Sequence, residues 1–320
     1  MILVVGLSPA WQRTLVFEEI IPGKVNRANH VSETASGKGV NVARVASILG
    51  AEVTLLTVAG GMCGRLLTTQ LMRQELKARV MTVKSETRIC QTLLSRSTTT
   101  ELVEEAGALS SAEVRDVVRA FRMLVREADL VVLTGTVPKG CGDNFYARLV
   151  DESTRRGVRV LIDTQQAQLR NALTRLPFLV KINRDELAAA TRVDCTGRTS
   201  LLPALRKLMR HGPQWAVITD GPKNIHVSES PGIQTCTFTP PQVEAKNTIG
   251  SGDAMMAGIA LGLLQGRSPP EAARLGAACG AANAMTAEPG YVRKTDVARL
   301  FLASARLSDN PPGRLCWTRN

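Results

Sequence analysis

Aromatic side chains are scarce in this chain. Phe, Trp and Tyr make up 3% of its 320 residues, whereas 40 Lys and Arg against 28 Asp and Glu give a net charge of +12. Proteins that bind nucleic acid usually combine basic patches with aromatic rings on which bases can stack. The shortage of aromatic residues therefore argues against a nucleic-acid partner, and we expect none.

Long apolar runs are missing as well. The longest, Ala254 to Leu264, is too short to cross a bilayer as a helix. The opening segment MILVVGL has no basic region before it and no cleavage site after it, both of which a secretion signal would need. We therefore expect no membrane partner and a cytoplasmic location.

Paired cysteines are the third absence. The seven cysteines form no C-x-x-C pair, and they lie at positions 63, 90, 141, 195, 236, 279 and 316. An odd number without such spacing indicates neither a disulfide framework nor a zinc site, so we expect mostly buried thiols. The last of them belongs to the C-terminal segment RLSDNPPGRLCWTRN, which we expect to be a poorly ordered tail.

The positive charge has two interpretations. Arg115, Arg119, Arg122 and Arg126 follow one another at intervals of three or four residues, which is typical of a solvated helix face. Solubility of the whole chain is therefore the preferred explanation of the charge. A ligand that carries phosphate is the second.

Compact apolar runs alternate with helix-period segments along the chain. The apolar runs are 53–58, 130–133, 158–162, 178–182 and 215–218, and the helical segments are 40–49, 112–127, 144–154 and 201–211. This alternation predicts an α/β fold with a mainly parallel central sheet and helices on both faces. The segments 14–36 and 88–103 alternate like solvent-facing strands, so they predict a small β-sheet lid on a single domain, 1–320.

Ligands of such sheets bind beyond the carboxyl ends of the strands, where three short segments contain glycine or polar residues. In TASGKGVNVARVASILG the G-K-G alone is explained by a glycine turn, and Lys38 lacks the following Ser or Thr of a phosphate-binding P-loop. In LTGTVPKG, Gly135 follows a strand as an ordinary turn residue. In KINRDEL, Asn183 and Glu186 have the spacing of a helix capping box.

The segment NTIGSGDAMMAGIALGLL needs more than a structural explanation. Gly250 and Gly252 leave backbone N–H groups free at a helix start, where they form an anion hole, and Asp253 lies among them. Gly258 and Gly262 each cost about 1 kcal/mol relative to alanine inside a helix, which indicates close packing. A carboxylate and an anion hole on a rigid helix end suit phosphoryl transfer.

These motifs resemble those of a known family. TASGKGVNVARVASILGAEVTLLTVAGG and NTIGSGDAMMAGIALG resemble the two signatures of the PfkB (ribokinase-like) carbohydrate kinases, and the motifs between them match in order and spacing. SPAWQRT, SETRICQTLL, TGTVP, IDTQQAQL and KINRDEL resemble segments of the fructose-1-phosphate kinase and tagatose-6-phosphate kinase branch. The resemblance implies a ribokinase-like three-layer fold with a lid. It also implies ATP, Mg²⁺ and phosphorylation of the free primary hydroxyl of a ketohexose phosphate.

The resemblance also assigns roles to individual residues. The general base would be Asp253, with an anion hole from the backbone of Gly250, Ser251 and Gly252. The substrate would be bound by Gln12, Gly37, Lys38, Asn41, Gly135 and Arg88. Of these, Arg88 suits the existing phosphate because its guanidinium can bind phosphate bidentately. The nucleotide would contact Thr219, Asp220, Gly221 and Asn283. Mg²⁺ would be held, through water, by Asn183 and Glu186.

Three departures from the branch surround the sugar site. Relatives usually have aspartate at the position of Gln12, glycine at Ser36 and asparagine at Glu104. Gln12 can still bind a hydroxyl, but it loses the stronger charge-assisted hydrogen bond. Two alternatives therefore stay open: a kinase for another sugar or a nucleoside, and a non-catalytic sugar-phosphate sensor on the same fold. The exposed lid edges, together with the resemblance, also favour a homodimer through the lid strands.

Overall fold

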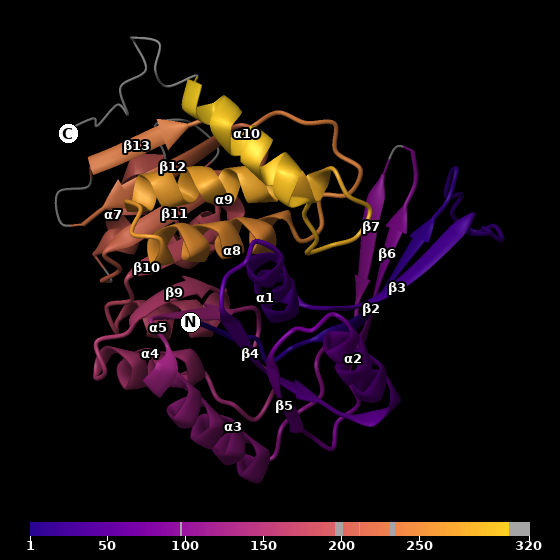
Figure 1. The fold of residues 1–320 in the computed structure, drawn as a ribbon, viewed down its shortest axis with the longest axis horizontal. Coiled ribbons are helices and arrows are strands. Elements are labelled where there is room, and N and C mark those ends of the chain that lie inside the picture. Colours follow the sequence, from indigo (N-terminus) through magenta and orange to yellow (C-terminus); the bar gives the residue numbers. More distant parts are fainter. Residues whose placement is uncertain (97, 196–200, 211, 231–233, 307–320) are drawn as a thin grey trace.

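The computed structural model describes the chain except for residues 97, 196–200, 211, 231–233 and 307–320. Its centre is a nine-stranded sheet with the strand order β13-β12-β11-β10-β9-β8-β1-β4-β5 (Figure 1). The strands are β1 (Ile2–Val5), β4 (Val53–Ala59), β5 (Ala78–Thr82), β8 (Leu130–Thr134), β9 (Arg159–Asp163), β10 (Leu179–Asn183), β11 (Trp215–Asp220), β12 (Asn224–Glu229) and β13 (Gln234–Phe238). Neighbours from β5 to β11 are parallel, and β12 and β13 add an antiparallel edge. The predicted mainly parallel sheet is confirmed.

Helices cover both faces of this sheet because its inner strands are apolar on both sides. In β1, Ile2 and Val4 belong to one core, whereas Leu3 and Val5 belong to the other. The first core is closed by α1 (Lys38–Ile48), α2 (Gly61–Arg73), α8 (Ser251–Leu264), α9 (Pro269–Ala284) and α10 (Lys294–Arg306). The second is closed by α3 (Ser111–Leu124), α4 (Phe145–Thr154), α5 (Gln166–Leu173), α6 (Arg184–Thr191) and α7 (Leu201–Met209). The three-layer arrangement agrees with the prediction.

Helix α8 is buried around nearly its whole circumference and packs closely on α9. A Cβ atom on Gly258 would lie 2.7 Å from the Cα of Gly276, and one on Gly262 would lie 2.9 Å from the Cα of Ala272. Any side chain at these glycines would push the two helices apart. The contact holds the start of α8 in place, as the sequence predicted.

A separate four-stranded sheet stands beside the main one and forms the lid (Figure 1). Its strands, in the spatial order β3-β2-β6-β7, are β3 (His30–Ser36), β2 (Ala10–Val16), β6 (Ile89–Leu94) and β7 (Thr99–Val103). Strand β2 begins four residues before the predicted segment 14–36. The prediction started too late because it relied on alternating polar and apolar side chains, and the first three residues of β2 are all buried and show no such alternation. Strands β3 and β7 are the edges.

The boundaries of the helices differ from the predicted ones by a few residues. The segment 112–127 forms α3 and a short 3₁₀ helix, η1 (Val125–Glu127). The segment 201–211 forms α7, and its last residue lies outside the described residues, as does the C-terminal segment from residue 307 with Cys316. No helix in the described part of the chain is long and apolar enough to cross a membrane.

Candidate active site

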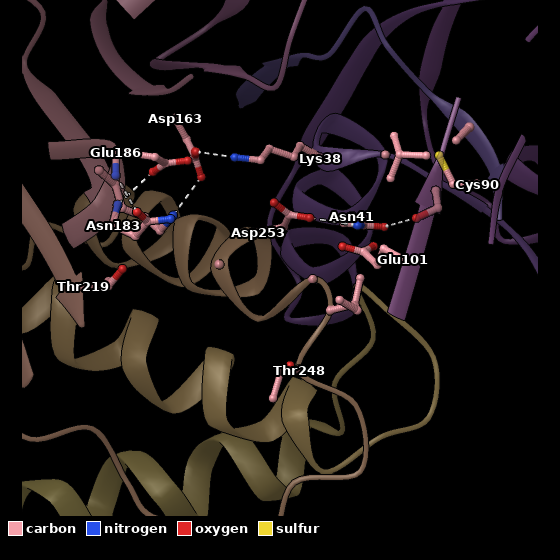
Figure 2. A pocket seen from close by; sticks show the side chains of 18 of the residues that line it. Lys38, Asn41, Cys90, Glu101, Asp163, Asn183, Glu186, Thr219, Thr248 and Asp253 are labelled. Atoms are coloured by element: carbon pink, nitrogen blue, oxygen red, sulfur yellow. Dashed lines mark hydrogen bonds and ion pairs between the residues drawn. The ribbon is translucent and has the colours of Figure 1, made fainter. Parts of the chain in front are cut away.

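A polar cavity of about 630 Å³ lies between the carboxyl ends of the central strands and the lid. Its walls come from the loop before α8, the start of α1, the ends of β9, β10 and β11, and the lid strands β2, β6 and β7 (Figure 2). Most of the predicted site residues line it together: Gln12, Gly37, Lys38, Asn41, Arg88, Asn183, Glu186, Thr219, Asp220, Gly221, Gly250, Gly252 and Asp253. Segments far apart in the sequence thus converge on one site.

Asp253 lies in the first turn of α8 and is buried, with 7% of its surface exposed. Its Oδ2 accepts a hydrogen bond of 2.8 Å from Nδ2 of Asn41 (Figure 2). The Asn41 amide is held in this orientation because its Oδ1 accepts hydrogen bonds from Ser36 and Arg44. Burial raises the pKa of Asp253 to about 6, against the opposing charge of Lys38. A carboxyl group with this pKa, facing a cavity, suits a general base.

Free backbone amides lie at the start of the same helix. The first i→i−4 bond of α8 runs from Ala254 N to Gly250 O (2.8 Å), so the amides of Gly252 and Asp253 have no carbonyl partner within the helix. The amide of Ser251 differs from the prediction, because it donates to Thr248 O (3.2 Å). Two amides and the positive end of the helix dipole therefore remain for an anion.

The loop before α8 has a conformation that requires glycine. Gly250 has a φ of +80°, and a Cβ atom there would lie 2.6 Å from the amide nitrogen of Gly290. Asn283 holds this loop from behind: its Nδ2 donates to Ile249 O (2.9 Å) and its Oδ1 accepts from the amide of Gly290 (2.8 Å). Its side chain is fully buried. The structure therefore places Asn283 behind the anion hole, as a support for the loop.

Three charged side chains form a connected group at one side of the cavity. The Asp163 carboxylate accepts a hydrogen bond of 2.8 Å from Nζ of Lys38 (Figure 2). It accepts another of 2.8 Å from Nζ of Lys181. Burial of Asp163 would raise its pKa, but the two ammonium groups outweigh burial and lower it to about 2. Burial would lower the pKa of Lys38, but Asp163 and Asp253 raise it on balance. Asp163 and Lys38 are therefore charged at neutral pH.

Asp163 and Lys181 are site residues to which the sequence assigned no role, although they open or lie within the quoted motifs IDTQQAQL and KINRDEL. Both stand near the carboxyl ends of strands that are otherwise apolar, β9 and β10. These strands are parallel neighbours with Leu161 beside Leu179 and Ile162 beside Val180, so the register brings Asp163 next to Lys181. An isolated charge at the end of a buried strand was the available signal. The pairing becomes visible once the register is known.

Asn183 and Glu186 form the capping box of α6. The Asn183 side chain accepts from the amide of Glu186 (2.8 Å), and Glu186 Oε2 accepts from the amide of Asn183 (2.8 Å). Both side chains line the cavity, but the cap occupies the Asn183 oxygen and one Glu186 oxygen. No group of three or more His, Cys, Asp or Glu with metal-ligand geometry occurs in the described part of the chain. These residues fit a Mg²⁺ ion that keeps most of its water.

A second cavity of about 480 Å³ adjoins the first. Both are lined by Thr219, Gly221, Thr248 and Gly252, and the second is also lined by Ser251. Its other walls are largely apolar and include Ile225, Pro240, Val243, Met255, Ala277 and Ala281. The carboxylate of Asp220 faces the first cavity and forms an ion pair of 2.9 Å with Arg184. An apolar chamber therefore meets a charged one at the loop that carries Asp253.

Arg88 connects the lid to the main body. Its guanidinium donates hydrogen bonds to the carbonyl oxygens of Ser8 (2.9 Å), Pro9 (3.4 Å) and Glu104 (2.9 Å). Three of the five N–H donors of an arginine are thus used by the backbone, and two remain. Gly135 lies behind the site: it has a φ of +82°, and a Cβ atom there would lie 3.4 Å from the Cβ of Lys38. Gly135 and Asn283 are absent from the described residues that line the two cavities.

The lid contributes three further polar side chains to the cavity wall. The Gln12 side chain donates from Nε2 to Thr92 Oγ1 (2.8 Å), and Cys90 and Glu101 line the cavity beside it. Figure 2 shows Glu101 on the same side of the cavity as Asn41. Neither Cys90 nor Glu101 was a sequence prediction, because nothing in an alternating strand marks which of its exposed faces meets a ligand.

Comparison with known proteins agrees with this geometry. The pfkB family of carbohydrate kinases matches residues 1–294. Phosphofructokinase-2 from Escherichia coli in complex with fructose-6-phosphate is 24% identical, with a TM-score of 0.85 over 95% of this chain and 99% of that chain. A structure from Thermotoga maritima described as a possible 1-phosphofructokinase is 24% identical, with a TM-score of 0.84 over 94% and 97%. Ribokinase from Arabidopsis thaliana, complexed with ribose and ATP, is 18% identical, with a TM-score of 0.75 over 94% and 98%.

The family match leaves out only the last 26 of the 320 residues, so the chain belongs to the pfkB family of carbohydrate kinases. The solved structures show that its fold is the ribokinase-like α/β fold. The protein is therefore a phosphotransferase that acts on a sugar or a sugar phosphate. Kinases of this family use ATP.

Proposed function

We propose that this protein transfers the terminal phosphoryl group of ATP to the free primary hydroxyl of a ketohexose phosphate, either fructose 1-phosphate or tagatose 6-phosphate, in the cytoplasm. One observation carries the proposal. Asp253, a buried carboxyl group with a pKa of about 6, lies where a charged cavity meets an apolar one, beside two backbone amides without partners. This is the arrangement that in-line transfer from a nucleotide to a hydroxyl requires.

The two cavities divide the substrates between them. The apolar cavity suits a nucleotide base, because ligand pockets of this size are lined mostly by apolar side chains with a few polar groups. Thr219 and Gly221, which line both cavities, would then lie along the nucleotide's phosphates. The sugar phosphate would occupy the polar cavity beneath the lid, with its acceptor hydroxyl at Asp253.

The residues of the site then have separate tasks. Asp253 accepts the proton of the attacking hydroxyl, which it can do because it is largely ionised at pH 7. The amides of Gly252 and Asp253 stabilise the charge that develops on the phosphoryl group. Lys181 supports them with a positive charge, since its Nζ lies 3.4 Å from where a Cβ atom on Gly252 would stand. When bound, Mg²⁺ would add charge neutralisation at the phosphates, and Asn183 and Glu186 would hold it through water.

The preference for a phosphorylated sugar is supported by the charge of the polar cavity. Lys38 and Arg88 face it with positive charge, and Lys38 stays protonated because Asp163 raises its pKa despite burial. Lys38 already pairs with Asp163, whereas Arg88 bonds only to backbone carbonyl oxygens and has no carboxylate partner among the described residues. A phosphate dianion would supply the negative charge that Arg88 lacks, and a neutral sugar would not. Gln12 favours the alternative that the substrate is another sugar, because the usual carboxylate is replaced by an amide.

A panel assay tests the proposal. Release of ADP is measured with ATP and Mg²⁺ and each of fructose 1-phosphate, tagatose 6-phosphate, fructose 6-phosphate, free fructose, free ribose and adenosine. We expect turnover with the first two, and a loss of about 10²- to 10⁴-fold in kcat for Asp253→Asn. The matched control is Asp143→Asn, the same change at an exposed carboxylate outside both cavities.

Each contrary result has a clear meaning. Full activity of Asp253→Asn would exclude Asp253 as the general base. Turnover confined to an unphosphorylated sugar or to adenosine would show that the substrate is not a ketohexose phosphate. If no member of the panel releases ADP while the sugar phosphates still bind, the protein is a sugar-phosphate sensor.

A further inference from the structure

A second charged cavity lies away from the active site, between α3 and α4. Figure 1 shows these two helices on the same face of the central sheet. It has a volume of about 460 Å³ and shares no lining residue with the two active-site cavities. Three arginines of the α3 face, Arg115, Arg119 and Arg122, line it together with Arg148 of α4. The sequence predicted a solvated helix face here. All three side chains are exposed, as predicted, and they also line a concave surface.

The composition of this arginine cavity is unusual. Its floor is apolar and buried, and consists of Val114, Val118 and Cys141. The other lining residues are the four arginines, Ser111 and Gly140, and no Asp or Glu is among the described residues that line the cavity. Four cationic side chains around an apolar floor, with no carboxylate beside them, suit an anionic ligand.

Two of the four arginines are neutralised from outside the cavity. Arg119 pairs with Asp116 (3.1 Å) and Arg122 pairs with Glu152 (2.7 Å). Within the described part of the chain, Arg115 and Arg148 have no carboxylate within 4 Å. Like charges that converge on one cavity repel each other, and an anion between them converts this repulsion into attraction. The unpaired arginines come from different helices, so a ligand that satisfies both must bridge α3 and α4.

We propose that the arginine cavity binds an oligophosphate, a small ligand that carries two or more linked phosphate groups. Guanidinium groups bind phosphate bidentately, and the arginines on two helices can engage more than one phosphate at once. The volume leaves room beside the phosphates for an apolar portion of the ligand over the valine floor. The proposal concerns binding alone and does not depend on which sugar the kinase phosphorylates.

The test uses inorganic tripolyphosphate as the probe and the full-length protein. Binding is measured by calorimetry for the wild type, for Arg115→Gln/Arg148→Gln, and for the control Arg65→Gln/Arg126→Gln. The control removes the same two charges from exposed arginines that do not line this cavity. Thermal melting first shows that all three proteins are folded. Hydrogen–deuterium exchange then locates the bound probe.

We expect tripolyphosphate to protect the amides of segments 111–124 and 141–150 in the wild type and in the control. Removing both unpaired arginines should weaken this binding by at least about 100-fold, about tenfold or more for each charged hydrogen-bond donor removed. Protection of segment 248–256 in the active site should be the same in all three proteins. Orthophosphate should bind the cavity at least about tenfold more weakly than tripolyphosphate, because it reaches fewer arginines.

Three results would overturn the proposal. The first is the absence of protection in segments 111–124 and 141–150. The second is an equal loss of affinity in the control, which would show that only the total charge matters. The third is equal affinity for orthophosphate and tripolyphosphate, which would show that the cavity recognises a single phosphate. Because none of these measurements uses turnover, they are independent of the panel assay.

Discussion

Asp253 should set the acidic limb of the pH–rate profile. Because burial raises its pKa to about 6, the ionised fraction falls from about 10/11 at pH 7 to about 1/11 at pH 5. If the ionised form is the general base, kcat/KM falls about tenfold over this interval, with the limb centred near pH 6. An ordinary aspartate, with a pKa of about 3.9, would leave the rate nearly constant down to about pH 5.

Asn41 offers a way to move this limb. Its Nδ2 donates a hydrogen bond of 2.8 Å to the Asp253 carboxylate, and this bond lowers the pKa of Asp253 relative to burial alone. A hydrogen bond to a charged group contributes about 1.5–3 kcal/mol, and 1.36 kcal/mol corresponds to one pKa unit. Asn41→Ala should therefore raise the apparent pKa by about one to two units, to between about 7 and 8.

The assay is kcat/KM from pH 5 to pH 9, with ATP saturating and the sugar phosphate limiting. Asn41→Ala should lose most of its activity at pH 6 and recover much of it at pH 9, since a shifted pKa leaves the ionised form intact. The control is Ser36→Ala, which removes a hydrogen bond to Asn41 Oδ1 but leaves the donor to Asp253 in place. An unmoved limb in Asn41→Ala, or equal loss at every pH, would refute the reasoning.

Three further substitutions have definite expected outcomes. Asp163→Asn should lower the free energy of unfolding by about 3–5 kcal/mol at pH 7, because it leaves two ammonium groups without their shared carboxylate. In urea titrations this difference from the wild type should shrink below about pH 4, since the folded-state pKa of Asp163 is depressed to about 2 and its contribution is lost as the pH falls toward that value. Arg88→Ala should raise KM for sugar phosphates more than for free sugars, and an unchanged KM for every substrate would contradict the phosphosugar assignment. Glu101→Gln should raise KM for the sugar phosphate with little change in the ATP KM, and equal KM values in variant and wild type would exclude a contact.

The central sheet and the catalytic loop were predictable because their signals are local. An apolar run such as 130–133 predicts a buried strand by itself, and the glycines around Asp253 stand next to it in the sequence. The charged group at Asp163 was not predictable in this way. Its partners belong to α1 and β10, and only the order and register of the strands bring them together.

The role of Asn283 could not be predicted from the sequence for a different reason. A polar residue in an alanine-rich helix indicates a function, but a ligand contact and a structural contact have the same signature there. The hydrogen bonds of Asn283 in the structure distinguish the two. Nδ2 of Asn283 donates to Ile249 O and Ser251 Oγ, on either side of Gly250. Its Oδ1 accepts from the amides of Gly290 and Tyr291, so the side chain has nothing left to offer a nucleotide.

Gln12 stands where relatives usually have aspartate, and the orientation of its amide determines which hydrogen bond it can offer a ligand. Nε2 donates to Thr92 Oγ1 (2.8 Å) and to the backbone oxygen of Arg13 (3.4 Å), and a carbonyl oxygen can only accept, so the amide cannot be turned over without losing a bond. Oε1, for which the described residues provide no donor, remains as an acceptor at the cavity. A hydroxyl bound there gains a neutral hydrogen bond, about half as strong as one to a carboxylate. Glu101 brings a carboxylate to the same cavity from β7, which lies beyond β6 in the lid sheet, so the negative charge missing at Gln12 is available two strands away.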